Sequence, residues 1–366
     1  MAFNISILKE TRAGECRVAL VPVVASRLQR LGARIYMESG AGMKAKFLNE
    51  DYEQVDFDSD RIQLAAHADI LLAVQPPPLE VVNALKPGAV LISFLQAPHE
   101  AALIEALRAR RVTSFAMERI PRISRAQAMD ALSSQAALAG YYAPLLGAVH
   151  LPRILPMLTT AVGSLRAAKV LVLGLGLGVA GLQALATAHR LGAVTEGYDV
   201  RPETREQALS LGAKFVDTGV DARGEGGYAR ELSEDERQRV GAVLDKHIAE
   251  ADMIITTASV PGRRAPRLVS LAQIERMKPG AVIVDLGAEN GGNCEGTVAG
   301  ETVEIGPVTI LGPCNVPSLL SQHASELYAK NLLNFVGLLV KDGALHIDFD
   351  DEIVAGTAVT HDGAVR

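Results

Sequence analysis

The fold of this chain is decided by the stretch 169-KVLVLGLGLGVAGLQALATAHRLGA-193. An apolar run enters a glycine-rich turn, and an alanine-rich segment of helical character follows it. Gly176, Gly178 and Gly181 have the spacing G-x-G-x-x-G. In that motif the first glycine permits a tight turn, the second lets backbone approach a pyrophosphate, and the third allows close helix–strand packing. The stretch therefore predicts a strand, a phosphate-binding turn and a helix, whose first N–H groups, near Val179 and Ala180, would face the pyrophosphate.

An acidic residue follows at the expected end of the next strand. Asp199 lies 23 positions after Gly176, where a carboxylate can accept hydrogen bonds from the adenosine ribose and repel a 2′-phosphate. This favours NAD(H) over NADP(H), whereas Arg201 is a residue type that can accommodate the 2′-phosphate. Gly174 leaves the register of the turn open by two residues. The alternative to a binding site is a Rossmann-like domain with an unused turn.

The rest of the chain repeats the same kind of unit. Short β-branched or leucine-rich runs alternate with helical stretches, which is typical of parallel sheets with helices on both faces. Three short motifs recur in the second half of the chain, which indicates two related domains. The pairs are 31-LGA-33 with 191-LGA-193, 68-ADI-70 with 251-ADM-253, and 85-LKPGAV-90 with 277-MKPGAV-282.

We therefore expect an α/β fold of two Rossmann-like domains with parallel sheets, linked by helices, and an NAD site in the cleft between them. The first domain, residues 1–138 plus about 319–366, has no nucleotide fingerprint. The second, residues 139–318, is the NAD(H)-binding Rossmann domain and carries a loop near 217–231 that is rich in glycine and acidic residues. Long loops of this kind are either functional lids or solvated insertions.

Composition excludes several classes of protein. The 366 residues are 49% hydrophobic and 21% charged, a balance typical of a globular chain of two or three domains. The net charge is −6, and no run of Lys and Arg is present, so nucleic acid is not an expected partner. Three widely spaced cysteines predict neither a disulfide framework nor a metal site. The uncharged stretch 170–188 contains four glycines and predicts strand, turn and helix rather than a membrane span.

A second polar constellation precedes the glycine turn. Arg122, Gln127, Asp130 and Ser133 are separated by 5, 3 and 3 positions. On one helix the last three would share a face, and a polar stripe at a crossover between domains could face the nicotinamide end of a dinucleotide. The alternative is a capped, solvated helix start in which Asp130 pairs with Arg122 or Arg125.

With these residues in view, the chain resembles the NAD(H)-binding alpha subunits of proton-translocating NAD(P) transhydrogenases. The resemblance covers nearly the whole chain, although two residues are inserted at the glycine turn. The matching segments are 9-KETRAGECRVALVP-22, 125-RAQAMDALSSQAALAGY-141, 176-GLGVAGLQALATAHRLGA-193, 198-YDVRP-202, 226-GGYARELSE-234, 255-ITTASVPGRRAP-266, 284-VDLGAENGGNC-294, 328-YAKNLLNF-335 and 351-DEIVAGTAVTHDGA-364.

The resemblance implies an assembly and a reaction. NAD(H) binds to this chain, the chain forms a homodimer, and hydride passes directly to or from NADP(H) on a separate beta subunit. A membrane-spanning subunit couples the transfer to proton movement. These partners would hold the chain in the cytoplasm, peripheral at the inner face of the cytoplasmic membrane.

The resemblance also implies roles for individual residues. The nicotinamide and its ribose would be bound by Arg122, Gln127, Asp130 and Ser133. Gln127 would also help to position the two nicotinamide rings. The pyrophosphate would lie on residues 176–181 and the adenosine end on Asp199, Val200 and Arg201. Gly227 and Tyr228 would lie on a mobile loop that closes over the nucleotide, and Ser259 would be a further cofactor-binding residue.

Two alternatives remain at this point. Alanine dehydrogenases share the KE…RVALVP opening, but their reaction needs a general acid–base group. That family places a lysine within the segment matching 72-LAVQPPPLE-80 and a histidine within that matching 92-ISFLQAP-98, where this chain has Gln75 and Gln96. Transfer between two nicotinamides moves only a hydride and needs ring alignment at ~3–3.5 Å. The second alternative is a non-catalytic NAD sensor, for which the same nucleotide site is expected.

Overall fold

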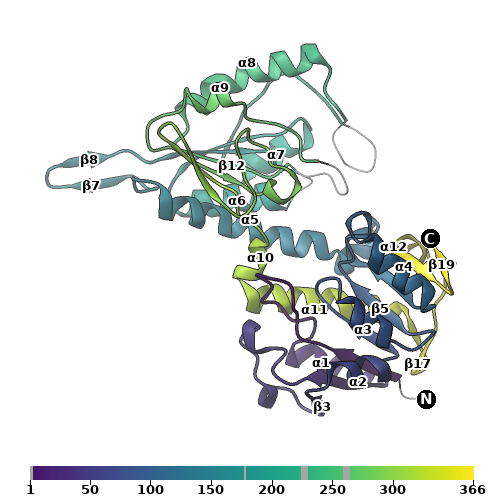
Figure 1. Cartoon of the computed structure of the whole chain (residues 1–366). Helices are drawn as coiled ribbons and strands as arrows, with labels where there is room; N and C mark the ends of the chain where they lie inside the picture. Colours follow the sequence, from purple (N-terminus) through teal and green to yellow (C-terminus); the bar gives the residue numbers. More distant parts are fainter. Residues whose placement is uncertain (1–2, 177–178, 224–229, 259–263) are drawn as a thin grey trace. The chain divides into compact units, whose positions relative to one another are not determined.

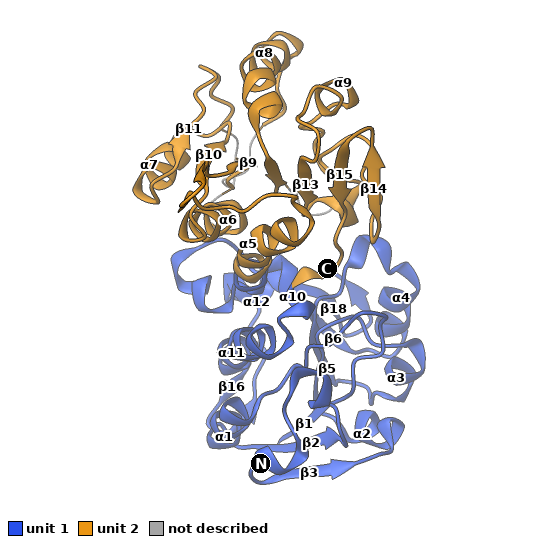
Figure 2. Cartoon of the chain, turned by 90° about the vertical axis from the view of Figure 1, so that its left-hand side faces the viewer, with its two compact units in different colours: residues 1–135, 317–366 blue, residues 136–316 orange. Residues whose placement is uncertain are grey.

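The computed structural model describes residues 3–176, 179–223, 230–258 and 264–366 (Figure 1). The chain divides into two compact units. Unit 1 comprises residues 1–135 and 317–366, and unit 2 comprises residues 136–316 (Figure 2). Each unit holds a mostly parallel sheet with helices on its faces, which confirms the expected α/β class.

The sheet of unit 1 has the strand order β19-β18-β6-β5-β4-β1-β2-β3. From β6 to β3 all neighbouring strands are parallel, and the C-terminal strands β18 and β19 extend the sheet antiparallel. The strands are β1 (Phe3–Ile7), β2 (Ala33–Glu38), β3 (Val55–Asp58), β4 (Ile70–Leu72), β5 (Val90–Ser93), β6 (Thr113–Ala116), β18 (Ala358–His361) and β19 (Ala364–Val365).

Alternating apolar side chains of these strands fill two cores, one on each face of the sheet. Ile70 and Leu72 belong to one core and Leu71 to the other, because successive strand residues point to opposite faces. Helices α1 (Pro22–Arg30), α11 (Ser321–Leu338) and α12 (Glu352–Thr357) contribute to the first core. Helices α2 (Arg61–His67), α3 (Leu79–Ala84) and α4 (Ala101–Ala109) contribute to the second.

The sheet of unit 2 has the order β11-β10-β9-β12-β13-β15-β14, with β14 antiparallel to β15 and every other pair parallel. Its strands are β9 (Lys169–Leu173), β10 (Val194–Tyr198), β11 (Lys214–Phe215), β12 (Met253–Thr256), β13 (Val282–Asp285), β14 (Thr302–Ile305) and β15 (Val308–Leu311). Helices α5 (Ala131–His150) and α6 (Ala180–Arg190) cover one face, and α8 (Glu234–Glu250) and α9 (Leu271–Ile274) cover the other. Helix α7 (Glu203–Ser210) follows β10.

The repeated sequence motifs form the same contact in both units. In unit 1, Asp69 accepts a hydrogen bond from the Asn4 backbone N–H (2.7 Å) and pairs with the ammonium of Lys86 (2.7 Å). In unit 2, Asp252 accepts from the Lys169 backbone N–H (2.8 Å) and pairs with Lys278 (2.9 Å). Each aspartate thus binds the start of an interior strand of its sheet, β1 or β9, to the turn of the KPGAV motif. We call this contact the aspartate staple.

A hairpin with exposed apolar side chains, preceded by the exposed Met157, is part of unit 2. Strands β7 (Leu158–Thr160) and β8 (Gly163–Leu165) project from the body of unit 2 (Figure 1). Its apolar side chains are exposed, to the extent of 99% for Val162 and 70% for Met157. Within the described ranges, no helix is both long and apolar enough to cross a bilayer.

Candidate functional site

The glycine turn connects β9 to α6 in unit 2. Gly176 has φ +74°, a conformation that favours glycine because it has no Cβ. At Gly181 a Cβ would lie 2.6 Å from the Leu175 Cα, so only glycine lets α6 pack this closely on the turn. Gly174 also has positive φ, and a Cβ there would lie 2.9 Å from the Ala258 Cβ. Gly176 and Gly181 thus meet the conformational demands of a dinucleotide turn, and the first N–H groups of a helix such as α6 have no acceptor within the helix itself.

Asp199 lies directly after β10 and is bound within its own loop. Its carboxylate accepts a hydrogen bond from the Gly176 N–H (2.8 Å) and from the Arg201 N–H (3.0 Å). The Arg201 guanidinium adds Nε (2.7 Å) and Nη2 (2.8 Å). The pair is almost fully buried. Asp199 thus fixes the turn through Gly176, and Arg201 occupies the oxygens that ribose hydroxyls would use.

Four of the cofactor residues expected from the sequence, Gly178, Gly227, Tyr228 and Ser259, lie outside the described residues. The described ones, Gly176, Val179, Ala180, Gly181, Asp199, Val200 and Arg201, come together around the β9–α6 turn and the end of β10 in unit 2. Helix α6 begins at Ala180, with Val179 as its N-cap residue.

The polar constellation of unit 1 differs from the single helical stripe expected from its spacing. Gln127 lies in a 3₁₀ helix, η5 (Ser124–Met129), and is exposed. Asp130, with ψ 87°, interrupts the helical backbone, so α5 begins only after it. Its carboxylate accepts from the Ser133 N–H (2.9 Å) and the Ser133 hydroxyl (2.5 Å), which caps α5. The prediction that these residues share one helical face was wrong, because Asp130 separates the 3₁₀ helix η5 from the α-helix α5.

Arg125 differs from the expected alternative, in which Asp130 pairs with Arg122 or Arg125. The Arg125 guanidinium binds the Asp351 carboxylate at 2.7 and 2.9 Å, so Asp351, at the N-terminus of α12, rather than Asp130 is its partner. Arg122 is exposed. The alternative also predicted a capped helix start, and this is present at the beginning of α5, where Asp130 is the cap. Gln127 is exposed just before that helix.

A buried network of unit 1 surrounds Glu15 and Arg17. The Arg17 guanidinium binds both Glu15 carboxylate oxygens, at 2.8 and 2.7 Å, and the Gln135 side-chain oxygen at 2.9 Å. The Ser318 hydroxyl donates to Glu15 at 3.0 Å. Despite its burial, the contacts with Arg17 lower the pKa of Glu15 to about 2. The charges of Arg17 and Glu15 are therefore matched inside unit 1.

Gln75 and Gln96 extend this network. The Gln75 amide donates to Glu15 (2.8 Å), and the Gln96 amide donates to the Gln75 side-chain oxygen (3.3 Å). Gln96 has a left-handed backbone, φ +50°, and its N–H binds the Glu118 carboxylate (2.6 Å). Neither glutamine can exchange a proton, and the hydrogen bonds hold them together.

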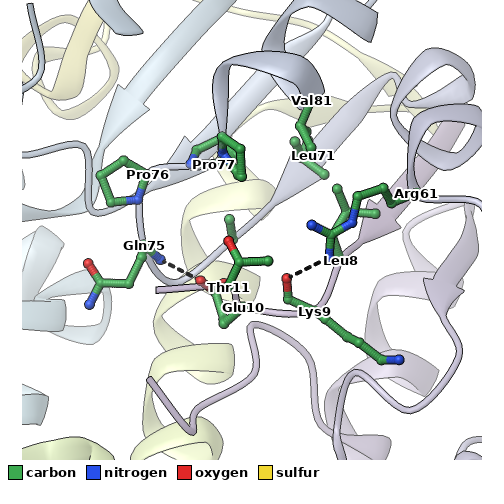
Figure 3. A pocket seen from close by; sticks show the side chains of 12 residues that line it. Leu8, Lys9, Glu10, Thr11, Arg61, Leu71, Gln75, Pro76, Pro77 and Val81 are labelled. Atoms are coloured by element: carbon green, nitrogen blue, oxygen red, sulfur yellow. Dashed lines mark hydrogen bonds between the residues drawn. The ribbon is translucent and has the colours of Figure 1, made fainter. Parts of the chain in front are cut away.

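A small pocket of about 20 Å³ lies beside this network, at the carboxyl ends of β1 and β4 (Figure 3). In the strand order of unit 1 this is the switch point, where open α/β sheets commonly bind ligands. The volume suffices for about one water molecule. Glu10 faces the loop after β4, where its carboxylate accepts from the N–H groups of Val74 (2.6 Å) and Gln75 (3.2 Å). Desolvation raises the pKa of Glu10 to about 7.

Glu10, Glu15 and Arg17 were not predicted from the sequence to form a site. All three belong to the stretch 9-KETRAGECRVALVP-22, used above only as a matching segment. The pattern that could have predicted the site is a pair of acidic residues and an arginine shortly after a buried strand, at the carboxyl edge of the sheet where ligands bind.

Comparison with known proteins defines the class of protein. Residues 6–139 match the alanine dehydrogenase/PNT N-terminal domain, and residues 143–366 match the alanine dehydrogenase/PNT C-terminal domain. The chain belongs to the alanine dehydrogenase/PNT family.

Individual relatives narrow the comparison within the family. The chain is 44% identical over 375 aligned positions to an NAD(P) transhydrogenase subunit alpha polypeptide of Rhodospirillum rubrum, covering 99% of this chain and 97% of that relative. A solved transhydrogenase structure from Sinorhizobium meliloti superimposes with a TM-score of 0.86 at 41% identity, covering 99% of this chain and 98% of the other. Alanine dehydrogenase of Mycobacterium tuberculosis is 28% identical, over 99% of this chain and 94% of that enzyme. The resemblance to transhydrogenase alpha subunits expected from the sequence is confirmed.

Proposed function

We propose that this chain is the NAD(H)-binding alpha subunit of a proton-translocating NAD(P) transhydrogenase. Hydride passes between its NAD(H) and NADP(H) held on a partner subunit. The observation that carries the proposal is the near full-length match, at 44% identity, to the transhydrogenase alpha subunit polypeptide of Rhodospirillum rubrum. The chemistry of unit 1 supports it, because Gln75 and Gln96 form a fixed pair without an exchangeable proton where an amino-acid dehydrogenase needs an acid–base group.

Unit 2 binds the dinucleotide. When bound, the nicotinamide supplies the hydride chemistry, and the protein supplies orientation. The β9–α6 turn holds the pyrophosphate, since Gly176 and Gly181 allow the backbone to approach it closely. Asp199 and Arg201 recognise the adenosine ribose, which requires the Arg201 guanidinium to share or leave the Asp199 oxygens.

The residues of unit 1 orient the nicotinamide end. The hydrogen bonds from Ser133 to Asp130 fix the orientation of the Ser133 hydroxyl and the Asp130 carboxylate before the nucleotide binds. Arg122 and Gln127 are exposed side chains on the same short stretch. Such a set can align one ring against another and requires no general acid.

The partners implied by this function are a beta subunit that binds NADP(H) and a membrane-spanning subunit that couples transfer to proton movement. Through them the chain lies at the inner face of the cytoplasmic membrane. The chain also forms a homodimer, and the β7–β8 hairpin supports this, because its exposed apolar side chains, Val162 and Met157 among them, are suited to burial against a second copy.

An assay of hydride transfer tests the proposed function. The purified chain is mixed with an NADP(H)-binding transhydrogenase domain, NADPH and an NAD analogue whose reduced form has a distinct absorbance. We expect reduction of the analogue only when both proteins are present. Tight NADH binding without turnover would instead identify a sensor. Oxidation of NADH with pyruvate and ammonia by the isolated chain would identify an amino-acid dehydrogenase and overturn the proposal.

A further inference from the structure

The carboxylate of Asp285 organises a buried loop beside the nucleotide turn of unit 2. Asp285 ends β13 and is completely buried. Its Oδ1 accepts from the Thr256 hydroxyl and the Gly287 N–H, both at 2.9 Å. Its Oδ2 accepts from the N–H groups of Asn293 (2.8 Å) and Cys294 (3.0 Å) and from the Thr297 hydroxyl (2.7 Å). These hydrogen bonds give the loop 286–297 one fixed conformation.

The fixed loop places the Asn293 amide between two other backbone segments. Asn293 is fully buried, and its Nδ2 donates to the carbonyls of Ala258 (2.9 Å) and Pro266 (2.8 Å). Both of its N–H groups are therefore used. Gly287 makes room for the amide, because a Cβ at this position would lie 2.7 Å from the Asn293 Oδ1.

Ala258 in turn contacts the glycine turn. A Cβ on Gly174 would lie 2.9 Å from the Ala258 Cβ and 3.0 Å from its nitrogen. The preceding residue, Thr257, is bound to the same turn, since its N–H donates to Leu173 (3.0 Å) and its hydroxyl donates to the Gly174 carbonyl. A continuous set of contacts thus leads from the buried Asp285 through the buried Asn293 and then Ala258 to Gly174.

We propose that Asn293 is a positioning residue for NAD(H) binding, acting through Ala258 on the glycine turn. This inference rests on the proposed function, because it assumes that the turn holds NAD(H). The amide holds the Ala258 carbonyl, and Ala258 sets the position of Gly174 and hence of the turn that receives the pyrophosphate. Asn293 itself need not touch the nucleotide.

The test compares N293A with D252N. N293A leaves the Ala258 and Pro266 carbonyls without the amide that donates to them. We expect the loss of these hydrogen bonds to loosen the turn and weaken binding by about tenfold. D252N breaks the aspartate staple at the opposite end of the strands of the same sheet and is the control for general loss of stability. NADH affinity is measured by fluorescence titration at a temperature at which circular dichroism shows each variant folded. Hydrogen exchange of residues 253–268 is measured by mass spectrometry.

We expect N293A to bind NADH about tenfold more weakly, with faster exchange at 257–268, and D252N to bind as the wild type does. Wild-type affinity in N293A, or an equal loss in both variants, would overturn the inference. If the wild type itself does not bind NADH, the proposed function fails instead. Should N293A not fold, G287A replaces it, because the added Cβ displaces the amide without removing a polar group, and the same weakening is expected.

Discussion

At the scale of single residues, Asp199 combines two tasks. Its carboxylate holds the glycine turn through the Gly176 N–H and is itself neutralised by Arg201. The position of Asp199 along the chain, 23 residues after Gly176, predicted a role for its carboxylate beside the turn. It could not predict that Arg201 folds back on it, because side-chain rotamers depend on the surrounding packing.

We expect D199A to weaken NADH binding by about tenfold, because the turn loses a buried hydrogen bond and the ribose loses its acceptor. Equilibrium dialysis of NADH measures the effect. E250A is the control, since Glu250 is an exposed carboxylate of the same unit, paired with Lys169 and outside the 217–231 loop. Unchanged affinity in D199A would remove the turn from the binding site.

Glu10 makes the stability of unit 1 depend on pH. Its pKa is about 7 when folded, against 4.5 ordinarily. Below pH 4.5 it is protonated in both states, whereas between 4.5 and 7 only the unfolded chain releases the proton. The contribution of Glu10 to stability therefore falls as the pH rises through this window, by up to about 3 kcal/mol.

We expect E10Q to lack this dependence. Urea unfolding at pH 5 and pH 8 measures the free energy of unfolding of both proteins. The difference between E10Q and wild type should shift in favour of E10Q at pH 8, and groups that titrate in both proteins cancel. An equal difference at both pH values would contradict the raised pKa of Glu10.

At the scale of elements, the aspartate staple explains why the sequence repeats. The ADI/ADM and KPGAV motifs supply the acceptor and the cation that fix one interior strand of each sheet, β1 or β9. The two copies differ in burial, since the side chain of Asp69 is 32% exposed and that of Asp252 4%. Arg153 adds a second cation to Asp252 (3.0 Å).

We therefore expect D252N to destabilise its unit by about 3 kcal/mol, because it removes the charge of a buried carboxylate that two partly exposed cations neutralise. The corresponding D69N should cost about 1 kcal/mol, as at a partly exposed pair. Thermal unfolding followed by calorimetry measures both. Equal losses would show that burial does not distinguish the two staples.

At the scale of the whole molecule, we expect the exposed hairpin of unit 2 to form part of the homodimer interface. We expect the triple variant M157S/V162S/L165S to be monomeric at concentrations where the wild type is a dimer, because these side chains are exposed in the single chain. Sedimentation velocity measures the species present. L209S is the control, since Leu209 on α7 is as exposed as Leu165. A triple variant that remains dimeric would place the interface elsewhere.

The local patterns of the chain were sufficient for its main elements. Strand β9 and helix α6 lie where 169–193 predicts them, because the apolar run and the glycine spacing act over a few neighbouring residues. Several strands of two to four residues were missed, because so short a segment carries little apolar periodicity. These are β3, β7, β8, β11, β14, β16 (Val340–Lys341), β17 (Ala344–Leu345), β18 and β19. The break at Asp130 was missed because capping competes with helical periodicity.

What the sequence determined by itself is the α/β class, the phosphate-type turn and the relationship to transhydrogenase alpha subunits, because each depends on residue types at short, fixed spacing. Only the tertiary structure decided that Gln75 joins Gln96, that Arg17 is matched by Glu15 and that Asn293 supports Ala258. These contacts join residues that lie in different loops, such as Asn293 and Ala258, or depend on side-chain rotamers. For Arg17 with Glu15 and for Asn293, burial selects the contact, because a polar group removed from water is stable only with a partner.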